Sequence, residues 1–313
     1  MSQMMEFTYP SADQRTKTHA WEWIPEGEIK GILQIAHGML EFIERYDEFA
    51  RYMNEQGILV VGNDHLGHGA SIGTTRDYGY FAEKNGNKVL LSDMRELQRI
   101  TQEKYPQLPY FLLGHSMGSF LARQYITMHG NWLDGVVICG TGWHAKVETT
   151  AGMLLCQVIG RVKGWRHRSR TITKIVMGNF NKKIQPCRTP EDWLSRDEAV
   201  VDKYRSDQRT RFTFTVNGYY NLLYSLHAMT DQKSLMKIPR NLPVFFIAGE
   251  NDPVGNYGLG VKRSVLSFKN VGIKQVECKL YPNDRHEILN EPDRHMVYKD
   301  IWNWIQAVLE TKD

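Results

Sequence analysis

The sequence has little cysteine, and its cysteines lie far apart. Among 313 residues there are four, Cys139, Cys156, Cys187 and Cys278, and no two of them form a C-x-x-C pair. This spacing excludes a small scaffold held together by disulfides. We therefore expect reduced, mostly buried thiols and a cytoplasmic protein.

Three further absences narrow the class of protein. No stretch approaches the ~18–20 consecutive apolar residues that a membrane span needs. The first six residues, MSQMME, have neither a basic flank nor an apolar run, so we expect no signal peptide and a soluble protein. The formal net charge of +4 is small for this length and gives no reason to expect nucleic acid as a partner. The sequence leaves the oligomeric state open.

Apolar runs are frequent enough to predict an α/β fold. With 42% hydrophobic residues the chain can bury a sizeable core. Residues 6–24 alternate polar and apolar, as in an antiparallel edge hairpin. Short apolar runs typical of buried strands then alternate with helical patterns, which predicts a mostly parallel sheet with helices on both faces. These runs cover residues 31–36, 58–61, 109–113, 135–139, 242–249 and 276–280.

The alternation of strand and helix patterns stops between residues 141 and 237. This segment is mostly helical in pattern, and we interpret it as a cap inserted above the carboxyl ends of the strands, where sheets of this class bind ligands. The core would then comprise residues 1–140 and 238–313. We expect an apolar inner face on the cap, suited to a lipophilic substrate. The residues predicted for that face are Met153, Leu154, Val158, Tyr219 and Leu223.

A candidate nucleophile lies at the turn after the run 109–113. Gly114-His115-Ser116-Met117-Gly118 has the pattern G-x-S-x-G, in which a serine on a tight strand-to-helix turn is pushed outward. The flanking glycines let the two backbones approach closely. The N–H group of Met117, free at the start of a helix, points where an oxyanion would form. A second such donor is Met39, in the His37-Gly38-Met39 segment that follows an earlier buried strand.

A serine hydroxyl needs a base, and the base needs an acid to orient it. His286 and Asp252 each lie on a loop after a strand, and the order serine, aspartate, histidine is that of hydrolases with a nucleophile elbow. Glu250 and Asp284 are rival acids. Glu250 is close to the buried strand, and Asp284 is close to His286 along the chain, so we favour Asp252.

Two other charged or histidine-rich stretches have simpler interpretations than their composition suggests. Residues 63–71, NDHLGHGAS, contain two histidines and an aspartate, but the spacing offers no fourth ligand, so we interpret them as a tight loop and expect no metal site. Residues 161–170, RVKGWRHRSR, form a basic segment of the cap. This segment is either an ordinary solvated face of the cap or, as a more specific hypothesis, a surface that transiently contacts anionic lipid.

Taken jointly, these motifs resemble the lysophospholipase and monoacylglycerol-lipase branch of the α/β-hydrolase superfamily, often labelled serine aminopeptidase-like. The resemblance spans nearly the whole chain, and the cap matches loosely, chiefly at residues 193–197. The matching segments are residues 37–46, 64–71, 114–118, 249–255 and 285–291.

The resemblance implies a catalytic triad of Ser116, Asp252 and His286, with the N–H groups of Met39 and Met117 as the oxyanion hole. It also implies that Glu41 and Arg45 lie near the alcohol end of the substrate, while Leu223 of the cap is our candidate for the acyl pocket. Neither a metal nor an organic cofactor is implied. Phe42 and Leu289 replace polar residues that relatives place there, which makes the predicted alcohol pocket less polar.

We therefore expect a serine hydrolase that cleaves a carboxylic ester with an apolar acyl chain through an acyl-enzyme on Ser116. Two alternatives remain. An aminopeptidase of the S33 type would need acidic residues in the cap to hold an ammonium group, for which Glu148, Glu191 and Asp192 are available. A non-catalytic receptor for a small ligand on the same fold would usually lack a triad member, and none is missing.

Overall fold

The computed structural model describes residues 3–178 and 180–311. The outermost residues of the two predicted core ranges, and residue 179 of the predicted cap, lie outside these described residues. The strands are β1 (Gln3–Pro10), β2 (Lys17–Ile24), β3 (Gly31–Ala36), β4 (Ile58–Asn63), β5 (Tyr110–His115), β6 (Gly135–Cys139), β7 (Val244–Gly249) and β8 (Val276–Tyr281).

The helices outside the cap flank these strands, and those of the cap lie between β6 and β7. The first group comprises α1 (Asp47–Glu55), α2 (Gly86–Lys104), α3 (Met117–His129), α9 (Leu259–Asn270) and α10 (Arg294–Glu310). The second group comprises α4 (Lys146–Lys163), α5 (Arg170–Met177), α6 (Glu198–Ser206), α7 (Val216–Ala228) and α8 (Gln232–Leu235). Short 3-10 helices are η1 (Ile43–Tyr46), η2 (Thr75–Asp77), η3 (Gly130–Trp132) and η4 (Ile288–Asn290).

All these strands join one sheet in the order β1-β2-β4-β3-β5-β6-β7-β8. β1 and β2 form an antiparallel hairpin at one edge, and β2 also runs antiparallel to β4. From β4 to β8 every neighbouring pair is parallel. The predicted α/β class, with a mostly parallel sheet and an antiparallel edge hairpin, is confirmed.

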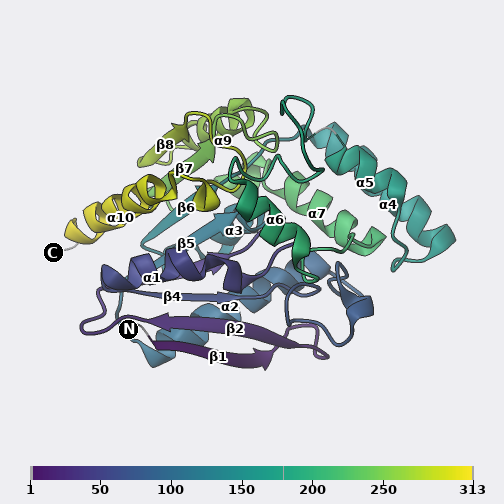
Figure 1. Cartoon of the computed structure of the whole chain (residues 1–313). Helices are drawn as coiled ribbons and strands as arrows, with labels where there is room; N and C mark the ends of the chain where they lie inside the picture. The colour runs from purple at the N-terminus through teal and green to yellow at the C-terminus, as the bar shows by residue number, and fades with distance from the viewer. Residues whose placement is uncertain (1–2, 179, 312–313) are drawn as a thin grey trace.

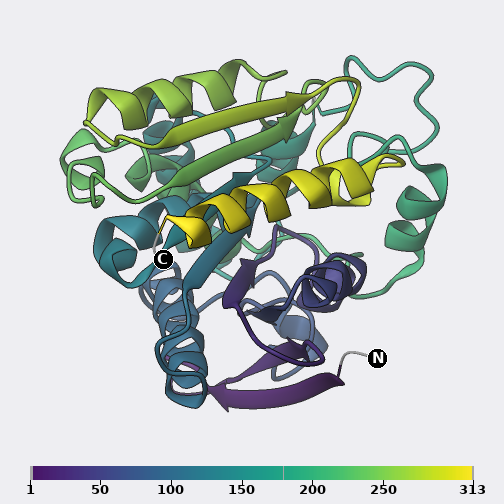
Figure 2. The ribbon, with the colours of Figure 1, turned by 90° about the vertical axis from the view of Figure 1, so that its left-hand side faces the viewer.

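Successive residues of the central strands enter two different cores because strand side chains alternate between faces. On β3, Leu33 and Ile35 belong to the core beneath α1 and α10, whereas Ile32 and Ala36 belong to the core beneath α2, α3 and α9. Figure 2 shows α10 in the foreground, lying across one face of the sheet. Both faces are therefore covered, which is why these strands read as continuous apolar runs.

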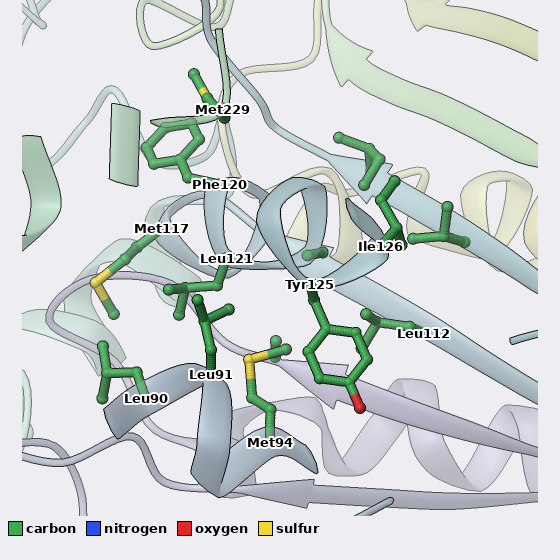
Figure 3. Close-up of a cluster of buried hydrophobic side chains, with 14 of the residues drawn as sticks. Leu90, Leu91, Met94, Leu112, Met117, Phe120, Leu121, Tyr125, Ile126 and Met229 are labelled. Carbon is green, nitrogen blue, oxygen red and sulfur yellow. The ribbon is translucent and has the colours of Figure 1, made fainter. Parts of the chain in front are cut away.

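The core beneath α2, α3 and α9 extends from the sheet into the packing between the helices around α3. Figure 3 shows Met117, Leu121 and Tyr125 of α3 facing α2, where Leu90, Leu91 and Met94 lie. These α3 residues recur every four positions, the spacing of one helix face. The helix that follows the candidate nucleophile is therefore anchored in the core from its first turn.

The residues between β6 and β7, which we call the cap segment, leave the sheet at its carboxyl end. Within the described residues this segment adds no strand to the sheet. Figure 1 shows α4, α5, α6 and α7 gathered beyond one end of the strands, away from both chain termini. No helix in the described part of the chain has the length and apolarity required to cross a bilayer.

The predicted inner face of α4 is wrong, because none of Met153, Leu154 and Val158 lines the cavity described below. Leu154 and Val158 point outward and are 55% and 59% exposed, whereas Leu155 and Gly152 line the cavity described below. Tyr219 of α7 is buried inside the cap, where its hydroxyl donates to Thr173 at 3.0 Å. The reason is that α4 carries apolar residues on two sides, so periodicity alone does not select the face that turns inward.

The predicted edge hairpin and strand runs agree with the observed strands to within a few residues at their ends. Two of the four cysteines, Cys139 and Cys156, are buried as expected, whereas Cys187 and Cys278 are exposed; all four are free thiols.

Candidate active site

Ser116 lies on the turn that joins β5 to α3. Its backbone has φ 52° and ψ −117°, a region that a residue with a side chain rarely adopts, and its N–H donates to the carbonyl of Cys139 at 3.0 Å. A Cβ atom at Gly118 would collide with the carbonyl oxygen of Ala36. The glycine therefore allows α3 to start against β3, and the serine side chain is left at the end of the sheet.

The loops after β7 and β8 bring Asp252 against His286. Nδ1 of His286 lies 3.0 Å from Oδ2 of Asp252, and both side chains are buried. The other oxygen, Oδ1 of Asp252, accepts the N–H of Val254 at 2.8 Å. The contact is an ion pair by distance, and within the described residues neither atom has a hydrogen-bond partner in favourable geometry. The carboxylate thus lies against the Nδ1 side of the ring.

The ring of His286 is packed from two sides. The rings of His115 and Trp193 each lie 4.9 Å from it, measured between centroids. The backbone is held as well, because the N–H of His286 donates to the carbonyl of Trp193 at 3.3 Å and the N–H of Glu287 donates to that of Leu194 at 2.7 Å. The candidate base is therefore held jointly by the nucleophile motif and by the cap segment.

The rival acids have other surroundings. Asp284 is buried and ion-paired with Arg196. Burial, together with the charges of Glu291 and Asp293, raises the pKa of Asp284 to about 7, although Arg196 opposes this shift. Glu250 is exposed at the end of β7. The structure thus brings Asp252, and neither rival, to the ring of His286.

Two backbone N–H groups remain available beside Ser116. Within the described part of the chain, the N–H groups of Met39 and Met117 donate to no protein acceptor. Met117 is the first residue of α3, where N–H groups have no partner inside the helix. A Cβ at Gly38 would lie 3.0 Å from Cβ of Ser116, so the turn that carries Met39 lies directly against the serine. This arrangement suits an oxyanion hole.

Glu41 and Arg45 belong to a buried ion network behind these turns. Glu41 accepts hydrogen bonds from Nδ1 of His115 at 2.9 Å, from the hydroxyl of Tyr46 at 3.0 Å and from Arg45 at 3.0 Å. Arg45 also makes two parallel hydrogen bonds to Glu287, at 2.7 and 2.6 Å. The strongest donors and acceptors of these side chains are therefore already engaged within the protein.

This network fixes charge beside the candidate base. Burial alone would raise the pKa of Glu41, but the hydrogen bond from His115 and the charge of Arg45 hold it well below its usual range. Burial likewise opposes a charge on His115, yet its hydrogen bond to Glu41 gives a net rise in its pKa. The network thus braces the loop of His286 through its neighbours Glu287 and His115.

A cavity of about 520 Å³ lies between the cap segment and the carboxyl ends of the strands. Its floor contains Ser116 and His286, and its walls are mostly apolar. Glu41 and Leu223 both line it. Arg45 does not line it, because its guanidinium is engaged by Glu41 and Glu287, two carboxylates that do line the cavity. The apolar wall from the cap comprises Leu155, Ile172, Ile175, Val176, Met177, Phe180, Trp193, Leu194, Leu222, Leu223 and Leu226.

The loop after β4 is held by Asp64. Its carboxylate accepts the N–H groups of Ile43 and Ala70, both at 2.8 Å, and contacts Nδ1 of His19 at 2.8 Å. Among the described residues, no group of three or more His, Cys, Asp or Glu side chains is arranged to hold a metal ion. Asp64 therefore stabilises the loop beside the turn of Met39.

Three residues that contact or brace the candidate base were not assigned a role from the sequence. His115 is inside the nucleophile motif, so its position was known but its ion pair with Glu41 was not. Glu287 follows the candidate base directly, and its partner Arg45 is 242 residues earlier. Trp193 belongs to the cap segment, and nothing in its local sequence pattern indicates that its ring packs against His286.

This fold and this site define an α/β-hydrolase. A model of the family described as serine aminopeptidase, S33, matches residues 27–293. The chain belongs to that family.

Relatives and solved structures agree with this assignment. The monoacylglycerol lipase of Mycolicibacterium smegmatis is 27% identical over 290 residues, which are 92% of each chain. A thermostable carboxyl esterase from Bacillus coagulans, solved in complex with glycerol, has a TM-score of 0.92 at 30% identity and covers 98% of this chain and 99% of its own. An open form of a lipase has a TM-score of 0.89 at 25% identity, with the same coverage.

Proposed function

We propose that this protein is a serine hydrolase that cleaves carboxylic esters with an apolar acyl chain. The observation that carries the proposal is the apolar cavity that ends at Ser116 and His286. The chain is a hydrolase of the lipase and esterase type, in line with its relatives. Because some relatives are monoacylglycerol lipases, monoacylglycerols and lysophospholipids are the substrate classes to test first.

The reaction proceeds in two halves. His286 takes the proton from Oγ of Ser116, and Oγ attacks the carbonyl carbon of the ester. The N–H groups of Met39 and Met117 stabilise the negative oxygen that forms. His286 then gives its proton to the alcohol as the C–O bond breaks. Water, deprotonated by His286, attacks the acyl-enzyme in the same way and releases the acid, while Asp252 stabilises the imidazolium throughout.

The residues between β6 and β7 act in this proposal as a lid that selects the acyl chain. Support comes from the cavity wall, in which α4, α5 and α7 supply Leu155, Ile172 and Leu223. Residues 1–140 and 238–313 supply the chemistry. We propose residues 141–237, which lie within the cap segment, as the boundaries of this lid.

We further propose that the enzyme is cytoplasmic and contacts anionic lipid surfaces transiently through its cap. The four free thiols support a reducing compartment. The outer face of α4 exposes Val147, Leu154, Val158 and Val162, and Arg161 and Lys163 lie at its end. Apolar side chains beside cations suit a lipid interface. Arg166 contributes less, because it is paired with Asp77 at 2.7 Å.

A fluorophosphonate probe tests the proposed function. The wild-type enzyme should be labelled, Ser116→Ala should not, and ester hydrolysis should be lost in parallel. A receptor without activity would show no labelling of the wild type. An aminopeptidase would be labelled but would cleave amino-acid anilides faster than octanoyl esters.

A further inference from the structure

A second hollow, of about 1000 Å³, opens beside the apolar cavity. Leu40, Met177, Trp193 and Tyr204 line both, so the two spaces share a wall. We call the second hollow the basic groove, because five cationic side chains line it. These are Arg168, Arg170, Lys174, Arg205 and Arg211.

The two carboxylates that line the basic groove are already neutralised. Glu191 is ion-paired with Arg205 at 3.0 Å. Asp202 is ion-paired at 2.8 Å with Arg188, which does not line the groove. Neither acid is therefore available to balance the remaining cations.

Four cations of the basic groove lack a carboxylate partner within the described residues. Arg170, Lys174 and Arg211 are exposed and make no side-chain hydrogen bond or ion pair there. Arg168 donates to the carbonyl oxygens of Thr213 and Tyr78, which leave its charge uncompensated. The groove thus presents positive charge from α5 and from the segment after α6.

The basic groove adjoins the apolar cavity at a wall that contacts the candidate base. Trp193, part of the shared wall, packs against the ring of His286, with the two centroids 4.9 Å apart and the rings tilted by 39°. Leu40, also in that wall, directly follows Met39, the candidate oxyanion donor. The shared wall therefore lies against the candidate base and beside the candidate oxyanion donor.

We propose that the basic groove binds a phosphate group carried by the alcohol moiety, so that acyl esters of phosphorylated glycerol are preferred over neutral monoacylglycerols. Arginine and lysine side chains recognise phosphate oxygens through charge-assisted hydrogen bonds. The inference rests on the proposed function, because it concerns the substrate of the same serine.

The test compares two soluble substrates below their micellar concentrations, 1-octanoylglycerol 3-phosphate and 1-octanoylglycerol. We expect kcat/KM of the wild type to be roughly tenfold higher for the phosphorylated ester at low salt, and the preference to shrink as salt screens the charges. Lys174→Gln with Arg211→Gln should abolish most of this preference and leave hydrolysis of the neutral ester unchanged. Arg161→Gln with Lys163→Gln, outside the groove, is the matched control and should retain the preference.

Three results would overturn the proposal. Equal kcat/KM for the two esters, with both cleaved at Ser116, would remove the phosphate preference and leave ester hydrolysis standing. A second result would be that inorganic phosphate protects the side chains of the groove from chemical modification while the enzyme shows no preference for the phosphorylated ester. The groove would then be a binding site for free anions and not for the substrate. Loss of activity in the groove variants only on phosphatidylglycerol vesicles would make it a membrane contact. Failure to cleave either ester would instead refute the proposed function.

Discussion

The sheet core buries most of its apolar side chains, whereas the cap segment leaves several large ones exposed to solvent. In the core, the central strands are buried on both faces, and the three residues of the proposed triad lie on loops and turns fixed by these strands. Among the described residues, most of the large apolar side chains that remain exposed belong to the cap, including Val147, Val162 and Ile175. The contrast fits the proposal that the sheet core carries the chemistry and the cap segment selects the substrate.

The largest expected effect lies in the core. Ser116→Ala should lower kcat by more than about 10⁴-fold, because no other group on the cavity floor can form the acyl-enzyme. The melting temperature should stay within a degree or two, since alanine fits the same turn. Steady-state kinetics with p-nitrophenyl butyrate and a thermal melt check both halves. Retention of more than a few per cent of kcat would remove Ser116 from the mechanism.

The next effect separates two aspartates of similar burial. Asp252→Asn should lower kcat by about 10³-fold to 10⁴-fold, because an amide does not stabilise the imidazolium of His286. Asp284→Asn should change kcat by no more than a few fold, since Asp284 is paired with Arg196 instead. Both variants are assayed side by side on one ester. Reversed magnitudes would make Asp284 the acid.

A smaller effect tests the cap as the selective part. Each added methylene should raise kcat/KM by roughly threefold to fourfold, because burying it contributes about 0.8 kcal/mol. Leu223→Glu, in the cavity wall, should flatten this slope across acetate to octanoate esters while acetate hydrolysis stays nearly unchanged. Leu154→Glu, on the outer face of the same cap, is the control. Equal losses on short and long esters would show that the cap is only scaffold.

The outer face of α4 should affect membrane contact and not catalysis. Val158→Ser with Val162→Ser should reduce binding to phosphatidylglycerol vesicles by roughly tenfold, because two exposed apolar groups are lost. Cosedimentation measures the effect, and hydrolysis of a soluble ester should not change. Leu259→Ser with Leu266→Ser, on the exposed face of α9, should bind vesicles as the wild type does. Wild-type binding by both double variants would contradict the proposed lipid contact.

The smallest expected effect is a dependence of stability on pH. The folded state raises the pKa of Asp284 to about 7, whereas an unfolded aspartate titrates at about 3.9. Between these two pH values the folded protein binds one more proton than the unfolded chain. The stability that this proton contributes is full below about 3.9 and is lost as the pH rises through about 7. The melting temperature of Asp284→Asn should fall less than that of the wild type between pH 5 and pH 8. Asp202→Asn, at an exposed position, should follow the wild type.

Sequence reasoning succeeds where the signal is local. The apolar runs of β3 to β7 are continuous because both faces of those strands are covered, and the turn of Ser116 needs glycines at fixed positions. Sequence reasoning fails where a side chain's position depends on a contact with a residue far away in the sequence. The pairing of Arg45 with Glu287 depends on how two loops meet, and the inward face of α4 depends on where α7 lies.

The short backbone pairing of Trp193 and Leu194 with His286 and Glu287 restricts how the enzyme opens. A lid that lifted as one rigid body would carry these hydrogen bonds with it and pull the imidazole out of register with its carboxylate. The cap segment is therefore tied at this junction to the loop of the candidate base. Any movement of the cap segment that admits substrate must keep these two hydrogen bonds if the imidazole is to stay beside Asp252.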